Sequence, residues 1–518
     1  MKKKYLYTVL ALSGLLLNTA CSLDETPENA LTYANSFNTE TELNATATSI
    51  NYYINTAIKD DPVFDTAGSL ADELSDNESV REWNPVSVVN AQQDWNDIYN
   101  IIYESNLLLD NIHRTRDLSR DRYNYYSGQA HFALGLAYLV LTQRYGDVII
   151  TKDSKTFTAY GLSPQAEVID TAIAHARRAY DLLPLSKDLR DLNGNAITDK
   201  QIASRGTCAA LLAQLYAWKG SMIDLYGIKG DAREAYSQAI NYCGELIDGK
   251  VGDYSLFSSP EELCEAFSNR EGGNEEAIFT ITFDKNRTAY TVSPNTPALE
   301  YTGWPVNYTT TLGDLAFSTS ARLYASHVND MYEEGDGRRT AFFYEADTPH
   351  EVDGIDYAIP YKFRAGVFDP DQSAPAGVTF RTIDADYVYW RLADFYLLRA
   401  ECLAKTGAED AAISDLNVIR SRAGASAYPA EKDNEGLKMA IFREREKEFI
   451  CENDARYFDI IRNGLYRTEL RGKFTSLSRQ DVLNGALVLP VPEGAFKDKN
   501  LHVVNTLIRQ KTYWIPYM

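Results

Sequence analysis

Basic side chains are scarce in this chain relative to acidic ones. Its 518 residues include 51 Lys and Arg against 73 Asp and Glu, which gives a formal net charge of -22 at pH 7. A nucleic acid partner requires a basic surface that neutralises phosphates, so we expect no nucleic acid binding. A strong negative charge is instead typical of a protein that must stay soluble on a crowded surface.

Cysteine and histidine are also rare, with six of each. CxxC, HxxxH and HExxH do not occur, so the sequence predicts no zinc site, and we expect neither a metal nor a cofactor. If Cys21 is modified, an odd number of widely spaced cysteines remains, which excludes a disulfide framework. We expect these to be small buried hydrophobic residues: Cys208, Cys243, Cys264, Cys402 and Cys451.

Signatures of the common enzyme classes are missing as well. The chain has no G-x-S-x-G, no P-loop and no Rossmann fingerprint. With 73 acidic residues, accidental carboxylate pairs are unavoidable, so a glycosidase pair cannot be inferred from their number. Asp369-Pro370-Asp371 lacks the rest of a calcium-binding loop. We therefore predict a protein that is not an enzyme.

Long apolar runs are absent apart from one near the start. Three lysines precede an uncharged run over residues 6–17, and Ala20 and Cys21 follow it. The run is shorter than the ~20 residues that span a membrane, and the pattern is typical of a secretory signal. The cysteine makes the site resemble a bacterial lipobox, although Asn18 departs from that pattern. The alternative is an ordinary cleaved signal followed by a chance cysteine.

The interpretation we favour divides this region in two. Residues 1–20 are a lipoprotein signal peptide, and residues 21–30 are a tether whose lipidated Cys21 anchors the chain to a membrane without spanning it. Ser22-Leu23-Asp24-Glu25 resembles the acidic tag of surface lipoproteins of Bacteroidetes.

Helical periodicity dominates the rest. Apolar residues recur at helical spacing over 95–109, 132–143, 203–219 and 232–247, which suggests hairpins resembling tetratricopeptide (TPR) units. Ser163-Pro164 and Ser259-Pro260-Glu261-Glu262 are typical of helix starts, the second as a capping box.

The middle of the chain differs. Residues 277–283 give a strand signal, whereas 284–320 and 350–385 are expected to be irregular. Helices are expected again from about Tyr389 and over 437–452. The predicted fold class is mainly α, a TPR-like scaffold with long irregular loops and minor β structure.

Several motifs in this order resemble the SusD/RagB family of outer-membrane lipoproteins. The similarity covers nearly the whole mature chain and rests on these segments: Trp95-Asn96-Asp97-Ile98-Tyr99 with Asn106; Leu139 to Val148, with Ile149 where proline is usual; Gly335 to Arg339; Trp390 to Glu401; and Glu444 to Ile461 with Arg462. The tail from Thr512 to Met518 departs most from the family pattern.

The resemblance implies a SusD-like fold with an N-terminal helical part over 31–270 and a C-terminal part over 271–518, together one compact unit. It implies a lipid-anchored protein of the outer membrane that faces the cell exterior. Its implied partner is a SusC-like TonB-dependent transporter, on which it sits as a lid.

The charged family motifs are interpreted as contacts that hold the fold together, because an unpaired buried charge is costly. They contain Arg391, Asp394, Glu401, Glu444, Arg445, Glu448, Arg456 and Asp459.

The candidate ligand contacts lie in loops, because flat aromatic rings stack on sugar faces while polar side chains bind the hydroxyls. One loop, 72–90, has Asn77, Arg81 and Trp83, and the other, 290–308, has Tyr301, Trp304, Asn307 and Tyr308. Trp95, Trp218 and Trp390 lie in helical patterns and are expected in the core.

The function predicted from all of this is capture of an oligosaccharide and its delivery to the transporter. Two alternatives stay open, an oligopeptide-binding RagB-like lipoprotein and a TPR-type scaffold for surface proteins. The sequence names neither the glycan nor the stoichiometry with the transporter.

Overall fold

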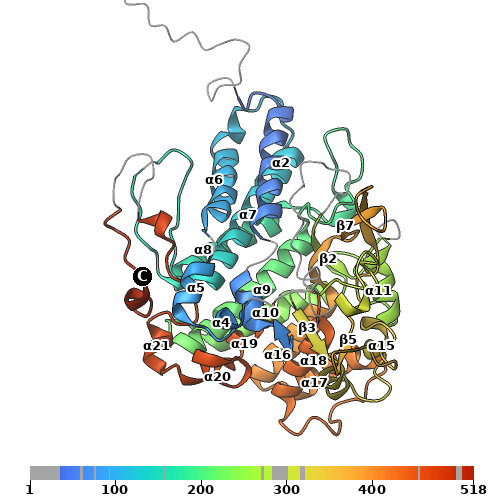
Figure 1. Cartoon of the computed structure of the whole chain (residues 1–518). Coiled ribbons are helices and arrows are strands. Elements are labelled where there is room, and N and C mark those ends of the chain that lie inside the picture. Colours follow the sequence, from blue (N-terminus) through green and yellow to red (C-terminus); the bar gives the residue numbers. More distant parts are fainter. Residues whose placement is uncertain are drawn as a thin grey trace, which may run out of the picture.

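Stacked helices make up most of the molecule, with a smaller β region to one side (Figure 1). This computed structural model describes residues 36–58, 62–74, 77–92, 94–156, 158–269, 273–282, 301–314, 321–452, 455–496 and 505–518. The predicted signal peptide, Cys21 and the tether lie outside these residues. In the part of the chain described, no helix is long and apolar enough to cross a membrane. The expected mainly α fold with minor β structure is confirmed.

The N-terminal part is a row of helices in which each packs on the next. α2 and α6 pack on α7, then α7 on α8, α8 on α9 and α9 on α10. Their bounds are Glu40–Ala57 for α2, Asn96–Asn111 for α6, Arg120–Tyr145 for α7, Gln165–Leu182 for α8, Arg205–Tyr226 for α9 and Ala232–Ile247 for α10. The predicted helical hairpins are therefore present.

Small side chains allow these helices to approach closely. Ala209, Ala210, Ala213 and Ala217 of α9 are fully buried, which lets neighbouring backbones come near without leaving a gap. A capping box starts α9. The Ser204 hydroxyl accepts a hydrogen bond from the backbone N–H of Thr207, and the Thr207 hydroxyl accepts one from the backbone N–H of Ser204.

The C-terminal part continues the same row. α16 (Leu392–Thr406) packs on α10 and on α17 (Glu409–Ala423), and α18 (Leu437–Phe449) packs on α16 and α17. Gly407 ends α16 in the left-handed conformation with φ of 88°, which glycine adopts without steric cost. Helices far apart in the sequence thus share one scaffold.

Short helices connect and cover this row. They are α3 (Pro62–Gly68), α4 (Glu78–Arg81), α5 (Pro85–Ala91), α11 (Pro260–Ser268), α14 (Ala325–Met331), α15 (Gly337–Phe342), α19 (Arg456–Arg462), α20 (Tyr466–Glu469) and α21 (Arg479–Leu483).

Within the described ranges of the chain, three small antiparallel sheets form the β region. One has the order β1-β3-β5-β4, β2 pairs with β8, and β6 pairs with β7. Their bounds are β1 Glu73–Leu74, β2 Ala277–Ile281, β3 Ala321–Tyr324, β4 Glu351–Val352, β5 Ile355–Ala358, β6 Gly366–Pro370, β7 Val378–Ile383 and β8 Tyr387–Arg391.

Four sequence expectations need correction. Residues 350–385 are not irregular but contain the strands β4 to β7. Short turns between these strands interrupt the alternation of apolar and polar residues that would have revealed them. Tyr389 and Trp390 belong to β8, and the helix begins only at Leu392. Ser163 pairs with Val148 in an isolated bridge, and Pro164 precedes the first turn of α8. Ser259 does accept from Glu262 N, but the Glu262 carboxylate turns to Ser258, so the capping box is incomplete.

The core residues expected from the sequence are largely in place. Trp95, Trp218 and Trp390 are at most 5% exposed. Cys208, Cys243, Cys264, Cys402 and Cys451 are buried free thiols, which confirms the expectation for the cysteines.

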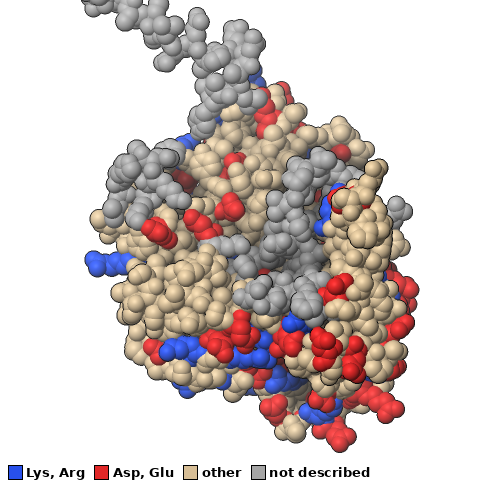
Figure 2. Space-filling view, in the orientation of Figure 1, with Lys and Arg blue, Asp and Glu red and all other residues tan. Residues whose placement is uncertain are grey.

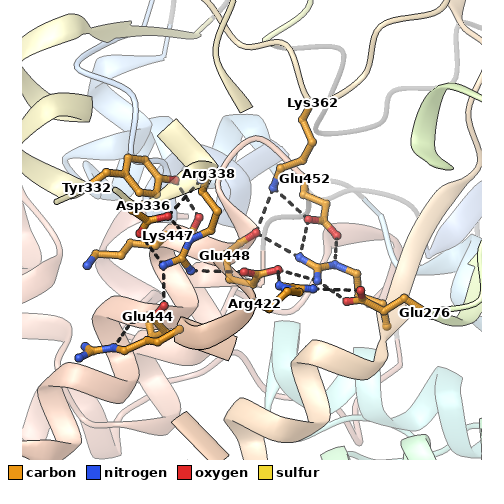
Figure 3. A network of polar contacts seen from close by, with 12 residues as sticks. Glu276, Tyr332, Asp336, Arg338, Lys362, Arg422, Glu444, Lys447, Glu448 and Glu452 are labelled. Carbon is orange, nitrogen blue, oxygen red and sulfur yellow. Dashed lines mark hydrogen bonds and ion pairs between the residues drawn. The ribbon is translucent and has the colours of Figure 1, made fainter. Parts of the chain in front are cut away.

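A network of buried charges links the β region to the C-terminal helices (Figure 3). Arg391, at the end of β8, binds Glu452 at 2.6 Å, Glu276 at 2.6 Å and Glu448 at 2.7 Å. Lys362 reaches Glu452 at 3.0 Å. All of these side chains are at most 1% exposed.

The network continues from Glu448 in two directions. Arg422 of α17 pairs with both Glu448 and Glu276, and Arg338 lies 3.3 Å from Glu448 and 2.6 Å from Glu444. Asp336 completes the shell of Arg338 at 2.7 Å. Each of these buried charges therefore has more than one ion-pair or hydrogen-bond partner. Such contacts are needed to offset the free-energy cost of removing a charge from water.

A second cluster joins α16, α18 and α19. Arg445 binds Asp394 and Asp459, both at 2.7 Å, and Arg462 binds Glu401 at 2.7 Å. Arg456 pairs with Glu446 at 2.8 Å. The charged side chains of the family motifs thus lie in ion pairs between packed helices.

These pairs fix the protonation of the buried carboxylates. Burial alone would raise the pKa of Glu448, but Arg422, Arg391 and Arg338 hold that pKa well below its ordinary value. Arg462 and Lys405 lower the pKa of Glu401 in the same way against its burial. Both side chains are therefore carboxylates at neutral pH. Their contribution to stability is lost only as the pH falls below the pKa that glutamate has in the unfolded chain.

Glu448→Gln tests the buried network. The amide keeps the shape but removes the negative charge shared by Arg338, Arg391 and Arg422, so we expect the free energy of unfolding to fall by about 3 kcal/mol or more. Urea denaturation measures this. Glu431→Gln, at an exposed position, is the control, with an expected change within about 0.5 kcal/mol. Equal stability of the two variants would contradict the role of the network.

A pair of histidines supplies a pH-dependent contribution. His131 of α7 and His175 of α8 face each other with an Nδ1–Nδ1 distance of 2.9 Å, so one ring donates to the other. Burial, helped by the neighbouring ring and Arg178, lowers the pKa of His131 to about 3. Burial lowers the pKa of His175 to about 4. Both rings are neutral in the folded protein at neutral pH.

Stability is therefore expected to fall as the pH drops from 7 to 5. In the unfolded chain both rings become protonated near pH ~6.5, whereas in the folded chain they stay neutral. Each ring therefore lowers the free energy of unfolding by up to about 1.4 kcal/mol per pH unit below that pH. His131→Gln should remove one of the two protons that are taken up on unfolding. The free energy of unfolding should then depend less steeply on pH, as measured by urea denaturation at several pH values. An unchanged slope would rule out this origin.

Candidate functional site

The segment 301–314 presents three aromatic side chains in very different surroundings. Its backbone is turned by a hydrogen bond from Asn307 N to Gly303 O of 2.8 Å. The Asn307 carboxamide oxygen accepts from Thr309 N at 3.2 Å, a local contact typical of a turn residue. Trp304 is half-buried and Tyr308 is exposed on either side of this turn.

Trp304 makes T-shaped contacts with two rings from the turn between α15 and β4. Its ring centre lies 5.3 Å from Tyr344 with the planes at 86°, and 6.1 Å from His350 at 66°. Tyr344 and His350 stack on each other at 6.0 Å. These contacts fix the ring, and the Trp304 side chain remains only half-buried.

Tyr308 lies on the β6–β7 hairpin. Its ring is 4.1 Å from that of Phe368, and Phe368 pairs across the strands with Phe380. Tyr308 is 56% exposed. The same hairpin carries the pair Arg381–Asp369 at 3.1 Å, with both side chains partly exposed.

This arrangement can bind the faces and edges of a sugar at once. The two rings of Trp304 and Tyr308 offer flat apolar surface, and Asn307 lies between them in the sequence. The Asn307 oxygen is bound by Thr309, and its N–H groups can donate to a hydroxyl group. Arg381 and Asp369 add a charged donor and acceptor nearby. The second predicted loop thus supplies an accessible aromatic site.

The first predicted loop does not. Trp83 is 0% exposed and packs among Tyr457, Phe474 and Trp514, with its indole N–H donating to the Ala486 carbonyl at 2.8 Å. A fully enclosed ring offers no face to a ligand, so the assignment of Trp83 to a ligand site is corrected to a core role.

Two other candidates are also buried. Arg81 is 1% exposed and donates to the carbonyl oxygen of Ala71. Tyr301 is 7% exposed, and its hydroxyl lies 3.2 Å from that of Ser69. Asn77 is exposed at the start of α4. Of the predicted ligand contacts in the segment 301–314, Trp304, Asn307 and Tyr308 are the ones that are not buried.

Four aromatic or heteroaromatic residues of this site were missed. Phe368 and Phe380 carry a usable signal, because two β-rich runs flank the turn-forming stretch from Asp371 to Gly377. Tyr344 and His350 lie in a polar turn and carry none.

Among the residues that the structure describes, no group of three or more His, Cys, Asp and Glu side chains could hold a metal ion. Asp369 faces Arg381, and Asp371 accepts hydrogen bonds from the backbone and side chain of Ser373 at 2.9 and 2.6 Å.

Relatives of known fold cover nearly the whole chain. A SusD homologue from Bacteroides thetaiotaomicron VPI-5482 superposes with a TM-score of 0.72 at 20% identity, over 92% of this chain and 98% of the other. Bacteroides fragilis NanU gives a TM-score of 0.65 at 19% identity, over 94% and 99%. At these identities the likeness establishes the fold.

Sequence comparisons agree with the structural ones. SusD-like protein P25 of Formosa agariphila is 22% identical over 414 residues, which is 75% of this chain and 73% of the relative. Residues 22–215 match a family described as starch-binding and associating with the outer membrane. Residues 227–486 match the SusD family model. Since this match spans half of the chain and includes the network around Arg391, the protein belongs to the SusD family.

Proposed function

We propose that this protein is a non-catalytic lipoprotein that binds oligosaccharides at the cell surface and delivers them to a TonB-dependent transporter of the outer membrane. Membership of the SusD family, and the description of the matching N-terminal family as starch-binding and associated with the outer membrane, support the glycan and the membrane parts. The observation that carries the proposal is the accessible aromatic pair Trp304 and Tyr308.

The proposed site is a platform and not a deep cleft. The Tyr308 ring packs against Phe368 and is 56% exposed. Stacking on a few rings gives modest affinity, which suits a protein that must release its ligand to a transporter. Lipidation of Cys21 would keep the protein at the membrane where that transfer takes place.

Ligand binding is tested with the soluble protein that begins at residue 22. Its tryptophan fluorescence is titrated with plant, host and microbial oligosaccharides and with mixed peptides. We expect saturable binding to one glycan class, weakened at least about tenfold, or ~1.4 kcal/mol, by Trp304→Ala and by Tyr308→Ala, because each substitution removes a stacking face.

Two further variants separate binding from folding. Tyr103→Ala removes an aromatic ring that is 44% exposed on α6, away from the platform, and should leave affinity unchanged. Trp83→Ala should lower the free energy of unfolding by about 3–5 kcal/mol because it opens a cavity in the core. Binding of peptides alone, or affinity insensitive to both platform variants, would contradict the proposal.

Membrane attachment is tested by Cys21→Ala. Without the thiol no acyl chain can be added, so we expect the protein to move from the membrane fraction to the soluble fraction, as followed by fractionation and by mass spectrometry of the mature N-terminus. Ser22→Ala is the matched control and should stay acylated. Cys21→Ala protein that remains in the membrane fraction would argue against a lipid anchor.

A further inference from the structure

A polar cavity lies against the residues that hold Trp304. Its volume is about 370 Å³, near the lower end of the ~300–1,000 Å³ that small-molecule sites usually have. The walls come from α14, from the turn between α15 and β4, and from β5. Its lining includes Asn329, Arg339, Tyr344, Asp347, His350 and Tyr357.

The cavity and the platform share a wall. Tyr344 and His350 contact Trp304 through their rings, and both also line the cavity. His350 is 5% exposed and firmly placed, because its Nε2 lies 3.1 Å from the Tyr344 carbonyl and its backbone N–H donates to Asp356 at 2.7 Å. Tyr344 and His350 therefore lie between Trp304 and the cavity.

The lining suits hydroxyl groups. Asp347, Asp356, Asn329 and Thr348 place polar groups in the lining, and Tyr344 and Tyr357 add aromatic rings to it. Arg339 and the His350 N–H already bind oxygens of Asn329, Asp347 and Asp356, so a sugar hydroxyl would use the lone pairs that remain. Glu345 accepts a hydrogen bond from the Tyr344 hydroxyl, which raises the pKa of that hydroxyl and keeps it protonated. Polar groups beside aromatic faces are the combination that recognises a sugar ring.

The charge of the lining disfavours anionic sugars. Arg339, which lines the cavity, already donates to Asn329 at 3.1 Å and to the Ala346 carbonyl at 2.9 Å, and it pairs with Asp347. Its guanidinium is therefore not free to neutralise a carboxylate or sulfate. Asp and Glu also predominate on the surface around α15 and β5 (Figure 2), which repels anions further.

We propose that this cavity binds one neutral sugar unit carried as a branch on the glycan whose main chain lies over Trp304 and Tyr308. This deepens the proposed function and rests on it. The ligand class is then a neutral, branched oligosaccharide, with the platform holding the main chain and the cavity selecting the branch.

The test compares matched glycans that differ only in the branch. The probes are linear manno-oligosaccharides and xylo-oligosaccharides, the same chains with single galactose or arabinose branches, and xylo-oligosaccharides with glucuronic acid branches. For the mature protein we expect a neutral branched member of one pair to bind at least fivefold more tightly than its linear counterpart. The acidic branch should give no such gain.

Ala325→Phe fills the cavity from the first turn of α14 and should abolish the preference for the branched glycan while leaving affinity for the linear chain. Ser326→Phe, at the next position and exposed, is the matched control and should retain the preference. Asn329→Ala removes a polar group of the wall without adding bulk and should reduce the preference. Asn329→Ala provides the test if Ala325→Phe does not fold.

The outcomes separate the two proposals. If Trp304→Ala weakens binding of linear and branched glycans but no preference for branches exists, or Ala325→Phe retains it, the cavity proposal is overturned and the proposed function stands. A preference for the acidic branch would also overturn it. If no glycan binds at all, both proposals fail.

Discussion

The position of Arg391 is the constraint on which the rest of this structure depends. Its guanidinium is buried where β8 ends and α16 begins, and it can stay charged there only because Glu276, Glu448 and Glu452 surround it. Glu276 comes from one stretch of the chain, and Glu448 and Glu452 come from a second stretch far along the sequence. Leaving one charge unpaired in this environment costs more than the pairs contribute, so the segments are stable together or not at all.

This constraint extends to the candidate site. Glu276 leads into β2, Glu448 lies in α18 and Glu452 follows it, and residues just beyond α18, Ile450 and Cys451, share a core cluster with Tyr301 and Val306. The segment that carries Trp304 and Tyr308 is therefore fixed at its buried residues to the part of the molecule that the charges hold in place. A rigid base below exposed rings is what a binding platform requires, because ordering a loose loop on binding would cost affinity.

The sequence predicted the framework better than the site, for a physical reason. Helical periodicity depends only on residues close in the sequence, and so helices can be predicted from the sequence alone. Buried charges need partners wherever they lie, which made the charged motifs recognisable as structural. Trp83 and Trp304, in contrast, stand in similarly polar stretches. Trp83 is enclosed by Tyr457, Phe474 and Trp514, which lie far along the chain, and no local pattern reveals such partners. The same holds for Tyr344 and His350, which meet Trp304 only in the folded chain.

Platform and cavity impose different kinds of selectivity on a ligand. An aromatic face accepts many sugars, since every pyranose has an apolar side, and so Trp304 and Tyr308 alone would discriminate little. A cavity whose polar groups are held in place by hydrogen bonds discriminates more, because only a ligand whose hydroxyls meet the remaining acceptors gains hydrogen bonds there. His350, which is held by the Tyr344 carbonyl and by Asp356, contacts both regions. A branch seated in the cavity would therefore set where the main chain crosses Trp304, so that recognition of the branch also fixes the register in which the glycan is held.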